Sequence, residues 1–172
     1  MVDDGESGEV TILAVRAKMF HMEKGVGWKE RGAGMLKINV PKSTVEFDDF
    51  GNPDATTFDA SVLEEDDDDS DGPKTVRLVM RQDHTLRVIL NTAVVPAMTF
   101  KLTQKLKSAY VLFTAFENGE AKQVQMKVSF SIRCPAFDVE TFLTSHPEQL
   151  SEANATMFTQ LMDLIQKQLA DV

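Results

Sequence analysis

The chain has 172 residues, 42% of them hydrophobic, and a formal net charge of -9. This length and apolar content fit one domain with one core and leave little for a second independent domain. A single cysteine, Cys134, excludes an intrachain disulfide and a cysteine-based zinc site. No run of about 18 apolar residues predicts a membrane-spanning helix, and the acidic start differs from a signal peptide, so we expect a soluble intracellular protein.

The acidic residues are concentrated in two segments that contain no lysine or arginine. Residues 1–9 hold four of the 27 Asp and Glu residues, and residues 46–71 hold twelve. The rest of the chain has 11 acidic and 18 basic side chains, a formal charge of +7. A basic body of this kind predicts an anionic partner, and its acidic appendages are compatible with a cationic one. We therefore separate an acidic N-terminal tail, residues 1–9, from a domain over residues 10–172.

The first predicted elements are two strands joined by a glycine-rich segment. A segment begins near Val10, and from Leu13 to Met19 apolar residues occupy every second position, which is the period of a half-buried strand. Residues 23–34 contain four glycines and predict a turn followed by a bulge. Alternation resumes at Leu36 and is stopped by Pro41, which gives the second strand.

Residues 43–73 interrupt the pattern of strands. The segment is rich in charge, contains Gly-Asn-Pro and Asp-Gly-Pro, and shows no sustained period. We interpret it as a long, acidic and largely disordered insertion. The aspartate run Asp66 to Asp69 lacks the spaced oxygens of a calcium-binding loop and is interpreted as solvated.

The remainder of the chain predicts a hairpin, further strands and one helix. Residues 76–90 form two alternating runs around a Gln82-Asp83-His84 turn, and strands follow at about 98–103, 108–116 and 123–132. A short helical turn is expected near residues 138–143. Residues 145–148 have the form of a helix-capping box, and apolar residues then recur at helical spacing: Phe158, Leu161, Met162, Ile165 and Leu169. About seven antiparallel strands and one amphipathic helix predict a mainly β protein, a bent sandwich or barrel covered by the C-terminal helix.

The sequence offers little evidence for catalysis. The three histidines, His21, His84 and His146, lie in a strand end, a turn and a helix cap, so we expect no shared metal or catalytic site. No P-loop and no nucleophile elbow is present. We predict no enzyme, no catalytic residue, no metal and no cofactor.

Basic residues recur on the polar faces of neighbouring predicted strands: Arg16, Lys18, Lys37, Arg77, Arg81 and Arg87. An ordinary solvated face would also carry such residues. Their clustering favours a binding surface.

Two motifs resemble a known family. Residues 28–32, Trp-Lys-Glu-Arg-Gly, are similar to the WKERG motif of Ran-binding domains, and residues 17–20 to the AKLF segment that precedes it. Residues 76–91, VRLVMRQDHTLRVILN, resemble the hairpin of the same family, which ends at Asn91. The order and spacing agree, apart from the acidic insertion. The position after Arg81, often basic in the family, is Gln82.

This resemblance implies a pleckstrin-homology-like fold and a function. Such domains bind the GTP-bound form of the small GTPase Ran and hold its acidic C-terminal tail on a basic surface, while their acidic N-terminal segment contacts a basic patch on Ran. The resemblance is strongest to nucleoporins and nuclear export cofactors, which implies the nucleus and the nuclear pore complex, a monomer, and importins or exportins as partners through Ran. The implied Ran-binding residues are Trp28, Lys29, Arg31, Lys18, Lys37, Arg77, Arg81, Arg87 and Asn91.

Alternatives remain open at this stage. Trp28 is either an exposed binding hot spot or a ring packed across a strand edge. The acidic insertion is hypothesised to compete with the Ran tail for the basic surface. A pleckstrin-homology-like module that binds phosphoinositides or a peptide would use the same basic strands. Nucleic-acid binding is disfavoured, because the acidic insertion would repel phosphates and few aromatic residues are available for stacking.

Overall fold

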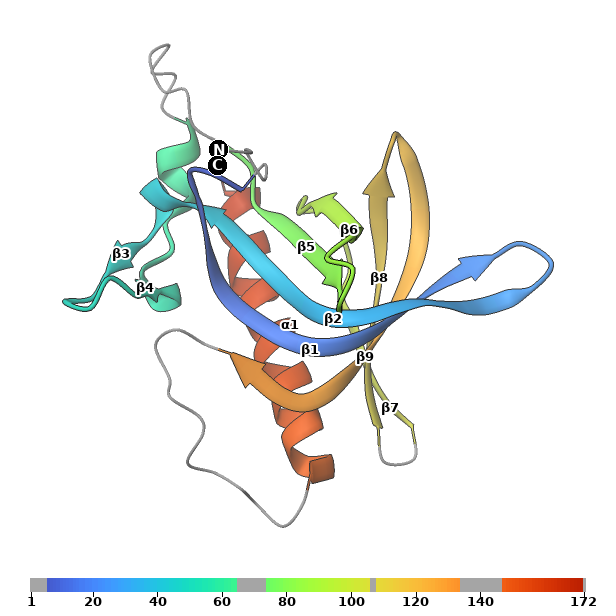
Figure 1. The fold of residues 1–172 in the computed structure, drawn as a ribbon. Coiled ribbons are helices and arrows are strands. Elements are labelled where there is room, and N and C mark those ends of the chain that lie inside the picture. Colours follow the sequence, from blue (N-terminus) through green and yellow to red (C-terminus); the bar gives the residue numbers. More distant parts are fainter. Residues whose placement is uncertain (1–5, 65–73, 106–107, 134–146, 172) are drawn as a thin grey trace.

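The computed structural model describes residues 6–64, 74–105, 108–133 and 147–171. Seven strands form one antiparallel sheet in the order β6-β5-β2-β1-β9-β8-β7. Their bounds are β1 (Glu9–Glu23), β2 (Gly27–Pro41), β5 (Arg77–Gln82), β6 (Val88–Ala93), β7 (Lys101–Lys105), β8 (Ser108–Glu117) and β9 (Glu120–Arg133). One helix, α1 (Pro147–Ala170), packs against β1, β7, β8 and β9 (Figure 1). The predicted fold class, a seven-stranded antiparallel sheet with a C-terminal helix, is confirmed.

The sheet curls until β6 approaches the far end of β8. The Phe116 backbone N–H donates to Thr92 Oγ1 at 2.9 Å, and the Asn91 backbone N–H donates to Glu117 Oε1 at 3.2 Å. These side-chain bridges satisfy backbone donors at a sheet edge that would otherwise stay open. The result is a nearly closed barrel, in which the inner face of the sheet forms the core and the outer face, the side away from α1, faces solvent.

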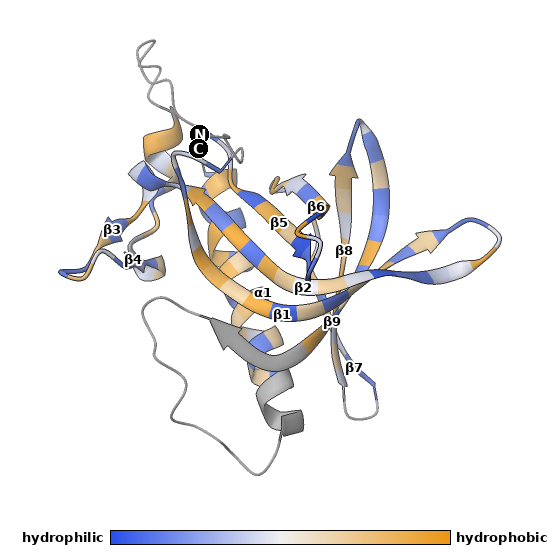
Figure 2. Cartoon of the chain, in the orientation of Figure 1, coloured by the Kyte–Doolittle hydropathy of each residue, from blue (hydrophilic) through white to orange (hydrophobic). Residues whose placement is uncertain are grey.

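The core follows the alternation in the sequence. Val15 and Ala17 on β1, Leu36 and Ile38 on β2, and Met126 on β9 are each at most 1% exposed. Hydrophobic and hydrophilic positions alternate along the strands in Figure 2. Because successive side chains of a strand point to opposite faces, one face is apolar and the other carries the charges.

A glycine at the end of the paired region of β2 and β5 permits the close approach of the two backbones. A Cβ atom on Gly34 would lie 2.0 Å from the backbone oxygen of Arg81. The pairing of β5 with β6 is irregular between Met80 and Arg81, next to this contact. The bulge expected in the glycine-rich segment is present as well, because the β1–β2 register shifts between Met19 and Phe20.

Strands β1 and β2 are each 15 residues long and extend beyond the sheet as a twisted arm (Figure 1). The turn at the tip of this arm is short, since Glu23 already pairs with Gly27. Residues 27–34, which the sequence placed in a turn and bulge, therefore belong to β2. The turn was predicted too long because only Gly25 and Gly27, at φ 82° and 93°, form it. Gly32 and Gly34 lie within the strand.

The acidic insertion is more ordered than its composition suggests. Residues 42–64 form a small hairpin, β3 (Glu46–Phe47) with β4 (Pro53–Asp54), and three 3-10 helices at Lys42–Thr44, Ala55–Thr57 and Ala60–Glu64. Phe58 and Ala60 are 3% and 1% exposed, and Gln168 of α1 bonds to the backbone of both. This differs from the largely disordered loop expected over residues 43–73, because two apolar side chains anchor the segment to the core. Residues 65–73 lie outside the described residues.

Helix α1 buries the stripe that its sequence predicts. Phe158, Met162 and Ile165 are each 0% exposed, and Phe158 contacts the ring of Phe100 edge-on at a centroid distance of 6.0 Å. The predicted helix is confirmed, and it begins at Pro147. The expected helical turn at residues 138–143 and the capping residues Ser145 and His146 lie outside the described residues.

Candidate functional site

The outer face brings together three of the basic residues that the sequence singled out. In antiparallel strands, directly paired residues lie on the same face. Lys37 of β2 pairs with Val79 of β5, and Arg77 and Arg81 flank Val79 at two residues on either side. Lys37 therefore lies beside both arginines. We call the region around Lys37, Arg77 and Arg81 the basic outer face.

A carboxylate from the start of β1 already occupies part of this face. Arg77 donates from Nε and Nη2 to the two oxygens of Glu9, at 2.8 and 2.7 Å, and from Nη1 to Asn91 Oδ1 at 3.1 Å. The Glu9 side chain is only 3% exposed. Glu9 Oε2 also accepts a hydrogen bond from Asn39 Nδ2 at 3.4 Å. The hydroxyl of Thr11 donates to Oδ1 of the same Asn39 amide at 2.7 Å. This bidentate geometry is the strong form of an arginine–carboxylate pair.

The pKa of Arg77 reflects this environment. Hydrogen bonding to Glu9 raises the pKa of the guanidinium above its ordinary value, against an opposing effect of burial and with further contributions from the charges of Glu9 and Glu6. The charged form is thus stabilised by contacts within the chain. The Arg77 guanidinium already donates hydrogen bonds to Glu9 and Asn91 of the same chain.

A second carboxylate, Glu6, lies over the other end of the face. Its Oε1 is 3.4 Å from Arg81 Nε and 3.3 Å from Arg81 Nη2, and its Oε2 is 4.0 Å from Lys37 Nζ. These contacts are longer than those of Glu9, and the side chains are more exposed, at 18% for Glu6, 30% for Arg81 and 35% for Lys37. The acidic N-terminal segment therefore lies on the basic outer face of its own chain.

Arg16 and Lys18 of β1 lie further along the outer face and have their own partners. Arg16 donates to both oxygens of Asp83, in the turn after β5, with an Nη1–Oδ1 distance of 3.2 Å. Its hydrogen bond is the main cause that lowers the pKa of Asp83. Lys18 Nζ lies 3.8 Å from Glu30, and both side chains are about half exposed. Arg16 fastens the β5–β6 turn to the sheet, whereas Lys18 remains accessible.

Trp28 and Lys29 lie on the arm, far from the basic outer face. Trp28 pairs with Met22 across the arm, and these side chains, with Val26 at the tip, are 39%, 41% and 70% exposed. Lys29 Nζ lies 3.5 Å from Glu23. Trp28 and Asn39, the residue paired with Arg77, are eleven positions apart on β2, which corresponds to roughly 36 Å of extended strand. Trp28 is thus part of an exposed apolar tip and does not pack into the core.

The remaining predicted residues lie at other places. Arg31, at the base of the arm, is 3.5 Å from Glu117, the same carboxylate that accepts from the Asn91 backbone. Arg87 is exposed immediately before β6. The nine predicted residues therefore do not form one site. The basic outer face holds Lys37, Arg77, Arg81 and Asn91, and the arm and its base hold Trp28, Lys29 and Arg31. Lys18 lies further along the sheet and Arg87 lies before β6. Four acidic side chains that pair with basic residues of the sheet were not anticipated from the sequence: Glu6, Glu9, Asp83 and Glu117.

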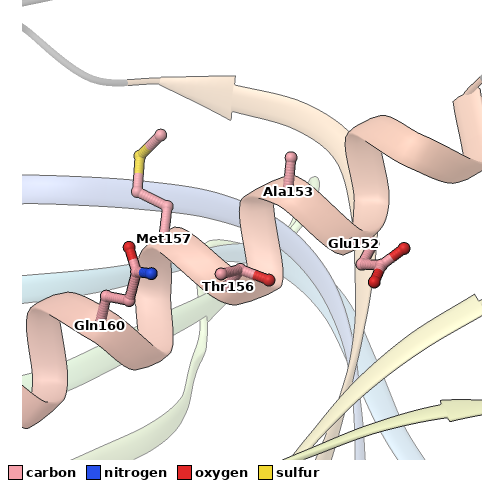
Figure 3. A pocket seen from close by; sticks show the side chains of 5 residues that line it. All are labelled: Glu152, Ala153, Thr156, Met157 and Gln160. Atoms are coloured by element: carbon pink, nitrogen blue, oxygen red, sulfur yellow. The ribbon is translucent and has the colours of Figure 1, made fainter.

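Other kinds of site are weakly supported. No group of His, Cys, Asp and Glu among the described residues is arranged to hold a metal ion. Within the same residues no helix is long and apolar enough to cross a membrane. A hollow on α1 is lined by residues of that helix alone, as Figure 3 shows: Glu152, Ala153, Thr156, Met157 and Gln160. A surface formed by one helix encloses no ligand and suggests no chemistry.

Comparisons with known proteins agree with the resemblance in the motifs. The family model of the RanBP1 domain matches residues 64–143. The chain is 53% identical to nucleoporin NUP56 of Chaetomium thermophilum over 169 residues, which cover 98% of this chain and 27% of that protein. It is 30% identical over 135 residues to the E3 SUMO-protein ligase RanBP2 of Homo sapiens, covering 77% of this chain and 3% of that protein. The chain thus spans about a quarter or less of the length of these relatives.

A solved structure shares the fold. The Ran-binding domain of the nuclear pore component Nup2 from Ashbya gossypii superimposes with a TM-score of 0.50 at 17% identity, covering 91% of this chain and 99% of that one. At this identity the likeness concerns the fold alone. The family model, the relatives and this neighbour together confirm that the chain resembles the Ran-binding domains and has their pleckstrin-homology-like architecture.

Proposed function

We propose that this chain binds the small GTPase Ran in its GTP-bound form and acts as a non-enzymatic binding module. The observation that carries the proposal is the match of the RanBP1 domain model to residues 64–143, together with the Trp-Lys-Glu-Arg-Gly motif on the arm. The arm and the basic outer face give the module two separate contact surfaces.

Each surface suits a different feature of the partner. The arm tip presents Trp28 and Met22 beside Lys29, a combination of exposed apolar area and charge that is typical of an interface anchor. The basic outer face suits an acidic segment, here the C-terminal tail of Ran, because Lys37 and Arg81 remain partly exposed. Arg31, paired with Glu117, supports the base of the arm.

The cellular setting follows from the relatives. The chain is 53% identical to a nucleoporin over nearly its whole length, so we place it at the nuclear pore complex, in the nucleus. It acts as a monomeric domain over residues 10–172 with an acidic N-terminal segment. Importins and exportins are reached through Ran.

The test is a calorimetric titration of the whole chain with Ran loaded with a non-hydrolysable GTP analogue and with GDP. We expect binding to be at least tenfold tighter for the GTP form, a difference of about 1.4 kcal/mol. Equal affinity for the two forms, or no binding, would contradict the proposal. A flotation assay with phosphoinositide vesicles is the second arm, and tight vesicle binding without Ran binding would favour the lipid-binding alternative.

A further inference from the structure

The two carboxylates on the basic outer face are held in different ways. Glu9 belongs to β1, pairs with Pro41 of β2, and keeps its side chain 3% exposed in a bidentate contact with Arg77. Glu6 precedes the strand, and its carboxylate lies 3.3 to 4.0 Å from Arg81 and Lys37. Moving the Glu6 side chain would break no strand pairing, whereas moving Glu9 would disrupt a buried network.

The contacts of Glu6 define how this face recognises a carboxylate. One oxygen faces the Arg81 guanidinium, and the other faces the Lys37 ammonium from the neighbouring strand. Val79, which pairs with Lys37, is 3% exposed between them. The two cations together can bind one acidic side chain of an extended peptide, and Glu6 holds that position in the unbound chain.

We propose that Lys37 and Arg81 form the carboxylate-binding site of the outer face, that Glu6 occupies it intramolecularly, and that an acidic peptide segment binds by displacing Glu6 while Arg77 stays paired with Glu9. The identity of this segment as the tail of Ran rests on the proposed function. The displacement itself depends only on the contacts within this chain.

Competition of this kind lowers the measured affinity in a defined way. A site that is occupied intramolecularly binds an external ligand only in the fraction of molecules where it is open. The partly exposed contacts of Glu6 are of the kind that contribute little, so the site opens readily. Removing the Glu6 charge should therefore tighten binding of an acidic peptide about two- to fivefold.

The experiment uses the whole chain and a fluorescent peptide of six aspartates, at low salt. Glu6→Gln is compared with Glu120→Gln, which removes the same charge from the exposed first residue of β9. We expect tightening for Glu6→Gln and a clearly smaller change for Glu120→Gln. Equal tightening in both variants would show an effect of net charge alone, and either that result or no binding by Glu6→Gln would overturn the proposal.

A second measurement separates the two arginines without any substitution. In nitrogen-labelled wild-type chain, the Nε–Hε signal of Arg81 should shift on addition of the peptide, while that of Arg77 stays in place. Movement of Arg77, or of neither, would contradict the proposed displacement.

A final arm repeats the comparison of Glu6→Gln with wild type using GTP-loaded Ran. If the peptide results hold and Ran does not bind, the proposed function fails and the displacement of Glu6 stands. If Ran binds and Glu6→Gln leaves both affinities unchanged, the proposed function stands and the displacement fails.

Discussion

Arg77 and Arg81 lie four residues apart on β5, yet their carboxylate partners should differ in how much they stabilise the fold. Glu9 is 3% exposed and receives three hydrogen bonds, two of them from Arg77, so Glu9→Gln weakens charge-assisted bonds in a nearly dry site. We expect it to lower the free energy of unfolding by about 1.5 to 3 kcal/mol. Glu6→Gln should cost less than about 1 kcal/mol, because its contacts are longer and more exposed. Urea denaturation measures both, and equal losses would contradict this assignment.

The pair of Arg16 and Asp83 gives the fold a stability that depends on pH. The hydrogen bond from Arg16 lowers the pKa of Asp83 below 3.8, so the folded state favours the ionised carboxylate. The resulting stabilisation is present above the unfolded pKa and is lost as the pH falls through the folded pKa. In thermal melts, the difference between wild type and Asp83→Asn should be present at neutral pH and shrink as the pH falls below 3.8 and through the lowered pKa of the folded state. A difference that is independent of pH would show that this ion pair contributes nothing.

At the residue scale, the sequence identified the basic side chains and missed their partners. The alternation along residues 76–81 predicts that Arg77, Val79 and Arg81 share a face. Glu6 and Glu9 are separated from them by about 70 residues, and their contacts depend on the strand order β1-β2-β5. No local period encodes that order. The hypothesis that residues 46–71 compete with the Ran tail for the basic outer face cannot be tested by deleting that segment, because the deletion would also remove the buried Phe58 and Ala60.

The arm formed by β1 and β2 is the element best placed to reach a partner. The tip of the arm presents Trp28, which is 39% exposed and is not one of the core residues. Trp28→Ala should therefore weaken binding of GTP-loaded Ran by about 2 kcal/mol or more and leave the urea midpoint nearly unchanged. Calorimetry and denaturation measure the two effects. A large loss of stability with unchanged affinity would instead assign Trp28 a structural role.

The close approach of β2 and β5 at the end of their pairing requires a glycine at position 34. Gly34→Ala places a methyl group against the Arg81 carbonyl, at a distance that the backbone can relieve only by moving, so we expect a loss of about 2 to 3 kcal/mol. Gly25→Ala at the arm tip has open space around its Cβ and only the strain of a positive φ, about 1 kcal/mol. Chemical denaturation of the two variants makes the comparison. A smaller loss for Gly34→Ala than for Gly25→Ala would argue against this packing.

Element by element, the strict alternation at residues 123–128 and the helical spacing from Phe158 to Leu169 were sufficient to predict β9 and α1. The glycine-rich segment was misassigned because the sequence does not distinguish a glycine in a turn from a glycine in a strand. Only the close approach of β5 shows why Gly34 is required. The order of residues 42–64 was not predicted, because Phe58 and Ala60 are two apolar residues in an acidic background. Their burial depends on Gln168 of α1, more than 100 residues away.

At the scale of the whole molecule, the curled sheet separates the proposed contacts. The basic outer face and the arm tip lie at different places on β2, so a bound protein would have to span both, or contact one with its globular body and the other with a tail. The sequence suggested one continuous basic patch, since it gave no measure of the length of the arm. This separation is compatible with the proposed partner, a GTPase that carries a separate acidic tail.

The most direct test of this account is the affinity of the whole chain for GTP-loaded Ran, compared with GTP-loaded Ran from which the acidic C-terminal tail has been removed. If the basic outer face binds the tail, removal of the tail should weaken binding at least tenfold, or about 1.4 kcal/mol, at low salt. Equal affinity for the two forms of Ran would contradict the account.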